Sequence, residues 1–197
     1  MRSMNYPLME MPFKITSFEL LTKKQAEQYF QWFLEVKESR MQQLEDFISQ
    51  SGGSISLDKT PESLVGLWKW FEDRIEWEDK TEKEIADESS SIPEQFRDVV
   101  PVSTKKLSVQ TLVLAMDISI YWGETLIANN AGVHWGYKTS PKKLEGVNRP
   151  QLIFDAMDGL ATFPYAMILV CIRKSSKEKN QNRLFDLYKT WSRNAQG

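Results

Sequence analysis

The segment from residue 108 to residue 122 is apolar on almost every side, and this constrains the fold more than any other feature. A helix that is apolar all round lies in a protein core or spans a membrane. The unbroken apolar runs of this chain are far shorter than the roughly 20 residues that cross a bilayer. The sequence therefore predicts a central, buried helix over residues 108–123. Gly123 is a suitable residue to end it.

Two further helices are predicted earlier in the chain. Thr22 and Gln25 have the spacing of a capping box and predict a helix over residues 23–49. The Ser-Gly-Gly-Ser stretch at 51–54 ends that helix. Thr60-Pro61-Glu62 then predicts the start of a second helix over residues 61–77. The apolar residues of these two helices recur at helical spacing: Ala26, Tyr29, Phe30, Phe33, Val36, Leu44, Phe47 and Ile48 in the first, and Leu64, Leu67, Trp68, Phe71 and Ile75 in the second.

Strand signals follow the central helix. Residues 125–128 and 133–138 favour β-structure and flank an Asn- and Gly-rich turn at 129–132, which predicts a hairpin. Residues 151–155 predict a third strand.

The C-terminal part returns to helical spacing. Pro164 favours a helix up to residue 173, although residues 168–172 would also fit a strand. A last amphipathic helix carries Leu184, Phe185, Leu187, Tyr188 and Trp191. The predicted fold class is α+β: long N-terminal helices packed with a small, mainly antiparallel sheet and a C-terminal helix. We expect one domain over residues 1–197.

The net charge of −2 is unevenly distributed. Residues 72–98 hold eleven acids against four bases, whereas residues 173–193 hold seven bases against two acids. Both segments fit solvated surfaces. The acidic one also fits a basic protein partner, and the basic one fits nucleic acid. The aromatic residues of the basic segment have the spacing of a core-facing helix, which makes nucleic acid the weaker alternative. We expect residues 78–91 to be a mobile loop or an exposed helix end.

The sequence contains no recognisable catalytic, metal or cofactor motif. One His, His134, and one Cys, Cys171, cannot supply the ligands of a zinc site. The chain has neither a phosphate-binding loop nor a dinucleotide fingerprint. Cys171 lies in an apolar run and is expected to be buried and inert. An enzyme that uses carboxylates alone stays possible. We therefore expect no cofactor. We also expect a cytoplasmic protein, because no secretory signal is recognisable.

Three polar residues interrupt the apolar segment. Asp117, Tyr121 and Glu124 share one face if the helix continues through Gly123. A buried acid is costly unless it is paired. Arg40 continues the apolar stripe of the first helix, so a buried Arg40–Asp117 or Arg40–Glu124 pair, with Tyr121 hydrogen-bonded beside it, is the structural interpretation. The alternatives are a ligand or partner site on this face, or acid–base chemistry by the two carboxylates.

The predicted hairpin adds three candidate binding residues. Asn129 and Asn130 lie at its tip, and Trp135 follows the turn. A Trp on a hairpin usually packs on the sheet, whereas an exposed one would indicate a recognition surface.

Residues 117–124, with their Tyr-x-Gly-Glu ending, resemble a pattern in small uncharacterised bacterial proteins. The following Asn129-Asn130 and Trp135-Gly136-Tyr137 belong to the same pattern. The segment 29–33 with Arg40, and residues 147–150, are also similar, so that the resemblance spans roughly residues 20–165. Proteins of this kind include some suspected of being immunity proteins for bacterial toxins. The resemblance implies a binding protein and supplies no catalytic residues.

The leading interpretation is a non-enzymatic bacterial interaction protein, of the immunity or antitoxin type, that covers the surface of a protein partner. The acidic segment would suit a cationic target such as a nuclease. The alternative is a small-molecule-binding domain or a carboxylate-dependent enzyme, with Asp117, Tyr121, Glu124 and Trp135 lining a pocket. Binding of nucleic acid or of a membrane is not expected.

Overall fold

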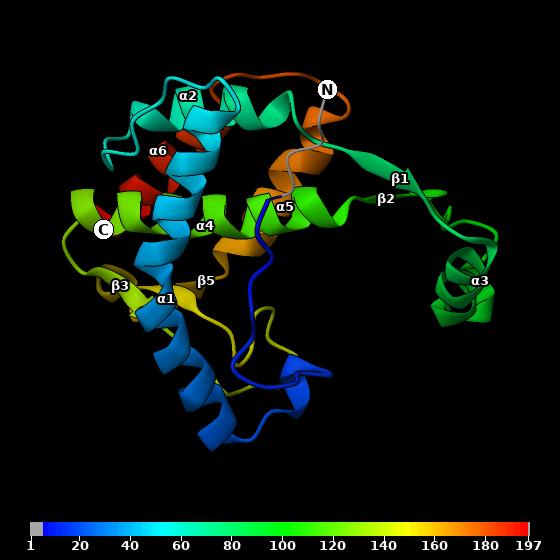
Figure 1. The fold of residues 1–197 in the computed structure, drawn as a ribbon. Coiled ribbons are helices and arrows are strands. Elements are labelled where there is room, and N and C mark those ends of the chain that lie inside the picture. Colours follow the sequence, from blue (N-terminus) through cyan, green and yellow to red (C-terminus); the bar gives the residue numbers. More distant parts are fainter. Residues whose placement is uncertain (1–5, 197) are drawn as a thin grey trace.

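A computed structural model describes residues 6–196 and arranges them around helix α4 (Val109–Asn129) (Figure 1). The long helix α1 (Lys23–Gln50) crosses α4, and α5 (Pro164–Ser175) and α6 (Arg183–Gln196) also pack on it. Helix α2 (Ser63–Glu72) packs on α6. The predicted α+β class, with its long N-terminal helix and its C-terminal helix, is confirmed.

Two small antiparallel sheets complete the fold. The larger consists of β3 (Val133–Gly136), β4 (Gln151–Phe154) and β5 (Leu160–Thr162), in that order. The smaller pairs β1 (Trp77–Asp79) with β2 (Lys105–Leu107). The remaining elements are α3 (Glu82–Ser91) and three short 3-10 helices, η1 (Phe18–Leu20), η2 (Glu94–Phe96) and η3 (Asp155–Met157).

One cluster of buried side chains extends from Tyr6 to Ala195, with Trp68 and Trp122 among its largest members. Helix α4 supplies much of this cluster, as its apolar sequence predicts. By length and composition α4 could also span a membrane, but 72% of its most apolar window is buried inside the protein. Its hydropathy is therefore accounted for by its place in the core.

The predicted first helix is confirmed as α1, and its capping box forms. The backbone N–H of Gln25 donates to Thr22 Oγ1 at 3.2 Å, and the backbone N–H of Thr22 donates to Gln25 Oε1 at 3.0 Å. Two of the N–H groups that a helix start leaves without partners are thereby satisfied.

The predicted second helix is too long. Helix α2 begins at Ser63 and ends at Glu72, whereas the prediction ran to residue 77. Beyond Glu72 the chain is drawn toward the start of α4: the N–H of Glu76 donates to Thr111 Oγ1 at 2.9 Å, and the N–H of Ser108 donates to the Glu76 carbonyl at 3.0 Å. Pairing of β1 with β2 therefore replaces the last helical turn.

The predicted hairpin around residues 129–132 is wrong. Residues 125–128 belong to α4, and β3 pairs with β4, so that Val133 faces Phe154. Gly123 does not end the helix. A Cβ atom at Gly123 would lie 2.4 Å from Cζ2 of Trp135, so this glycine makes room for the indole ring. It marks a close contact between helix and strand.

At the C-terminal end, the alternative left open for residues 164–173 is settled as a helix, α5. Cys171 is buried in it, and burial raises the pKa of its thiol to about 11, which fits an inert side chain. The last amphipathic helix is α6, which buries Leu184 and Tyr188.

The acidic segment forms part of a projecting arm, which we define as residues 77–107. In Figure 1 the β1–β2 ribbon leads away from the other helices to α3 at its far end. Residues 78–91 thus hold a strand and an exposed helix in place of a loop. Helix α3 has its own capping box between Thr81 and Glu84, and none of its residues is buried.

Candidate functional site

The polar face of α4 is built around a buried ion pair between α1 and α4. Arg40 Nε donates to Asp117 Oδ1 at 3.0 Å, and Arg40 Nη2 donates to Asp117 Oδ2 at 2.6 Å. The Tyr6 hydroxyl also donates to Asp117 Oδ2. The remaining donors of Arg40 reach the Pro7 carbonyl at 3.0 Å and Gln43 Oε1 at 2.7 Å. The predicted Arg40–Asp117 pair is present, with its polar atoms satisfied inside the protein.

Each charge of this pair stabilises the ionised form of the other. Burial raises the pKa of Asp117, and the hydrogen bonds from Arg40 and Tyr6 oppose that rise. Burial would lower the pKa of Arg40, but the adjacent Asp117 carboxylate raises it above its usual value. Burial and the same carboxylate also raise the pKa of Tyr6, which therefore acts as a neutral donor.

Glu124 forms a second polar cluster one to two turns further along α4. Its Oε1 forms an ion pair with Lys37 Nζ at 2.9 Å and accepts a hydrogen bond from Trp135 Nε1 at 2.8 Å. Its Oε2 lies 3.2 Å from Lys59 Nζ. Burial by itself would raise the pKa of Glu124, but the bonds from Lys37, Trp135 and Lys59 outweigh it, and the pKa is lowered. The carboxylate is therefore held in its charged form.

Tyr121 joins neither cluster. Its hydroxyl accepts a hydrogen bond from the Lys59 backbone N–H at 2.9 Å and lies 2.6 Å from Ser63 Oγ. It ties the start of α2 to α4, and the predicted bond beside the Arg40 pair does not form. The sequence places Tyr121 on the correct helix face but does not specify its partner.

Asn129 and Asn130 act at the C-terminal end of α4. Asn129 Nδ2 donates to the carbonyls of Thr125 and Lys59, both at 2.8 Å. Asn130 Nδ2 donates to the Leu126 carbonyl at 2.9 Å, and its Oδ1 accepts from Ser192 Oγ at 2.6 Å. Asn130 thus satisfies a carbonyl group that the helix end leaves without a partner, and Asn129 joins the end of α4 to the segment before α2. Their predicted position at a hairpin tip is wrong.

Three side chains that contact the two carboxylates were not predicted from the sequence: Tyr6, Lys37 and Lys59. Lys37 carries a readable signal, because it lies four residues after Phe33 and three before Arg40 on the same stripe of α1. Tyr6 and Lys59 lie in segments without periodicity, and nothing in their local sequence indicates burial against α4.

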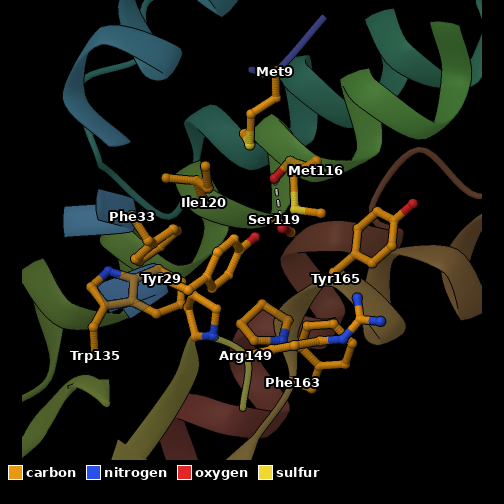
Figure 2. A pocket seen from close by; sticks show the side chains of 12 residues that line it. Met9, Tyr29, Phe33, Met116, Ser119, Ile120, Trp135, Arg149, Phe163 and Tyr165 are labelled. Atoms are coloured by element: carbon orange, nitrogen blue, oxygen red, sulfur yellow. Dashed lines mark hydrogen bonds between the residues drawn. The ribbon is translucent and has the colours of Figure 1, made fainter. Parts of the chain in front are cut away.

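The face does not surround a common pocket. Of its residues, Trp135 alone lines the small cavity of about 30 Å³ that Figure 2 shows, with Phe33 and Tyr29 beside it and Arg149, Phe163 and Tyr165 opposite. Asp117 and Glu124 are buried in separate ion pairs, away from solvent. Within residues 6–196, no three His, Cys, Asp or Glu side chains are grouped so that they could hold a metal ion. The arrangement ties α1, α2 and β3 to α4.

The arm carries a different surface, rich in exposed acids. Three ion pairs brace it internally: Lys80–Glu88, Lys105–Asp79 at 3.2 Å and Lys106–Glu84 at 2.6 Å. Other acids of the arm are exposed and form no ion pair with any residue of the described chain: Glu78, Glu82, Asp87, Glu94 and Asp98.

Apolar side chains are exposed beside these acids. Phe96 is 49% exposed, Val99 72% and Val100 44%, which is far more than core residues of their size. They follow one another in η2 and the segment after it. Exposed apolar groups next to charged ones are typical of binding surfaces.

No family model, no curated protein and no solved structure matches this chain.

Proposed function

We propose that this protein is a non-enzymatic interaction protein that binds a basic protein surface through its arm, in the manner of a bacterial immunity protein or antitoxin. The observation that carries the proposal is the exposure of α3, a capped helix of ten residues with none buried. A helix that contributes nothing to the core of its own chain is available to a partner.

The charge of the arm indicates the kind of partner. Acids that form no ion pair within the described chain give the arm a negative field, which accelerates association with a positively charged surface. A toxin that acts on nucleic acid carries such a surface, because it must contact phosphates. The resemblance of the central segment to suspected toxin-immunity proteins supports the same class of partner.

The exposed apolar residues of the arm would supply binding affinity, which exposed charges alone provide only weakly. Exposed charge pairs contribute little affinity, whereas apolar groups buried at the centre of an interface contribute much of it. Phe96, Val99 and Val100 would form that centre, with the acids of the arm around it.

The test uses affinity capture with charge-reversed variants. The arm variant carries Glu82→Lys, Asp87→Lys and Glu94→Lys, which are exposed acids outside the capping box and the internal ion pairs. Glu84 is left intact because it caps α3 and pairs with Lys106. The matched control variant carries Glu27→Lys, Glu35→Lys and Glu62→Lys, which change the net charge equally on the rest of the surface.

We expect the natural chain and the control variant to retain the same basic protein from a lysate of the source cells, identified by mass spectrometry. The arm variant should lose it, and with the purified partner its association rate at low salt should fall at least tenfold, by roughly the loss of electrostatic steering. Equal retention by all three chains, or retention of no basic protein by any of them, would refute the proposal.

A further inference from the structure

Arg149 precedes β4, and its guanidinium packs among aromatic rings. Its Cζ atom lies 3.8 Å from the ring centroid of Phe18 and 5.4 Å from that of Phe163. Among residues 6–196, no carboxylate forms an ion pair with this guanidinium, and no acceptor takes a hydrogen bond from it. Glu19 acts on it only at longer range. The N–H groups of Arg149 therefore have no partner in the described chain.

Two other arginines, Arg40 and Arg74, also lie over aromatic rings, but their guanidinium groups have hydrogen-bond acceptors. Arg40 lies over the Tyr6 ring and is bonded to Asp117. Arg74 lies over the Trp70 ring, 4.6 Å from its centroid, and donates to the carbonyls of Trp70 at 2.8 Å and Ser51 at 3.0 Å. In both, stacking accompanies hydrogen bonds to acceptors. The guanidinium of Arg149 packs against aromatic rings but donates no hydrogen bond to any residue of the described chain.

A half-buried guanidinium without acceptors is unfavourable, because its nitrogen atoms lose part of their hydration and gain no hydrogen bond within the described chain in return. Burial lowers the pKa of Arg149, with some opposition from Tyr29 and Glu19, which is the direction expected of an uncompensated cation. Phe18 and Phe163 pack against the guanidinium, and two parallel N–H groups along the edge of a guanidinium match the two oxygens of a carboxylate.

Arg149 lines an open groove of about 380 Å³, together with Lys142 and Lys143. Helix α5 begins at this groove. Its N-cap, Phe163, provides no side-chain hydrogen bond, and the backbone N–H groups of Tyr165 and Ala166 find no acceptor within residues 6–196. A helix N-terminus attracts an anion through such N–H groups. Donors from a side chain and from the backbone thus meet in one place.

The hydroxyl of Tyr29, on the inner side of Arg149, also has no hydrogen-bond partner among residues 6–196. Tyr29 is 4% exposed and lines the 30 Å³ cavity together with Arg149 and Tyr165, which border the groove as well (Figure 2). Within the described residues its hydroxyl makes no hydrogen bond, and burial raises its pKa to about 12, which keeps it a neutral donor. The cavity has room for a water molecule that would bridge this hydroxyl to a ligand oxygen.

The groove also limits the charge and shape of its ligand. Glu19 and Glu145 line it together with three cations, Lys142, Lys143 and Arg149, and the two acids disfavour a multiply charged anion. Leu144 and Leu169 provide an apolar wall beside Arg149. These features suit a single carboxylate on a small apolar body.

We propose that this groove binds a small organic acid, whose carboxylate is held by the edge of Arg149 and by the N–H groups of Tyr165 and Ala166. The apolar part of the ligand lies against Leu144 and Leu169. The arm contributes no residue to this site, so the assignment is independent of the partner surface.

The test is a nuclear magnetic resonance titration of the full chain, labelled with ¹⁵N, with sodium benzoate as the probe. Phenyl phosphate is the doubly charged comparison, and benzamide is the neutral one. We expect benzoate to shift the Arg149 Nε–H signal and the backbone signals of Tyr165 and Ala166 with saturation, at a Kd of about 1 mM or below. Benzamide should leave these signals unchanged.

Variants locate the binding. Arg149→Gln should weaken benzoate binding at least tenfold, roughly the worth of a charge-assisted bidentate contact. Arg149→Lys, which keeps the charge and loses the bidentate edge, and Lys143→Gln should weaken it less, and both test the site if Arg149→Gln fails to fold. Arg74→Gln is the matched control, because Arg74 is also stacked on a ring but already bonded to carbonyls, and it should bind as the natural chain does.

Three results would overturn the assignment: no saturable benzoate binding up to about 10 mM, benzoate affinity unchanged in the Arg149 variants, or tighter binding of phenyl phosphate than of benzoate.

Discussion

At the scale of single residues, burial decides what the Arg40–Asp117 pair contributes. Arg40 is 5% exposed and Asp117 is fully buried. Removal of one partner leaves the other charge without compensation, which costs about 3–5 kcal/mol, whereas an exposed pair is worth at most about 1 kcal/mol. The pair is therefore essential to the folded state without being a large net source of stability.

We predict that Arg40→Met lowers the free energy of unfolding by about 3–5 kcal/mol, measured by urea denaturation. The double variant Arg40→Met with Asp117→Asn should recover part of this loss, because the second change removes the orphaned charge. A loss below about 0.5 kcal/mol in the single variant, the size of a surface effect, would contradict the structural role of this pair.

Glu124 should make stability depend on pH. Its pKa in the folded protein lies below the ordinary value of 4.5, so its contribution is present above that value and is lost as the pH falls through the folded-state pKa. We predict that Glu124→Gln is less stable than the natural chain at neutral pH and that the difference narrows below pH 4.5. Thermal unfolding over a pH series measures this. A constant difference across the series would show that Glu124 does not titrate in this way.

The residue pairings could be predicted only in part. Arg40 and Asp117 could be matched because each is a charged residue in an otherwise apolar helical stripe, and a buried charge requires a partner. The roles of Tyr6 and Lys59 depend on where irregular segments cross α4, which local spacing does not encode. The unsatisfied donors of Arg149 are likewise a property of the folded chain alone.

At the scale of elements, Gly123 explains the main error in the sequence-based fold. A glycine followed by a turn-like Asn-Asn-Ala-Gly sequence is typical of a helix end and a hairpin. Here the glycine serves the contact with Trp135 inside a continuous helix, and the strand pairs with the distant β4. Helices α1 and α4 were predictable from their apolar periodicity, whereas strand pairing between distant segments was not.

Gly123→Ala should therefore destabilise the protein. The new Cβ would lie 2.4 Å from the Trp135 ring, and overpacking of this kind costs about 1–3 kcal/mol. Gly66→Ala in α2 is the matched control, because its Cβ would meet Ile55 at an ordinary 3.4 Å. Helix propensity then predicts a gain of up to about 1 kcal/mol there. Equal effects of the two substitutions on urea denaturation would refute the close contact at Gly123.

Helix α3 should exchange its amide hydrogens much faster than α4. None of its residues is buried, whereas α4 buries residues along most of its length. Elements with few buried contacts open locally at low free energy, while core helices open only with global unfolding. Hydrogen exchange followed by mass spectrometry should show early exchange over residues 82–91. Protection of α3 equal to that of α4 would contradict its isolation from the core.

At the scale of the whole molecule, the fold separates the core from the surface that we propose for partner binding. Buried polar clusters tie α1, α2 and β3 to the central helix, and the exposed acids and apolar groups of the arm lie outside that core. Sequence composition predicted an acidic segment for a basic partner, but not its form as a helix at the end of a ribbon. This arrangement implies that the arm can be removed without loss of the core.

The most direct measurement compares the full chain with a variant in which residues 80–104 are replaced by Asn-Gly. Asp79 and Lys105 are cross-strand partners, so a two-residue turn can join them. We expect the thermal midpoint to change by less than about 2 °C, as for a surface change. Affinity for the captured basic protein should fall at least about 100-fold, the loss expected when the main contacts of an interface are removed. An arm-deleted chain that folds and retains its affinity would contradict the proposed function.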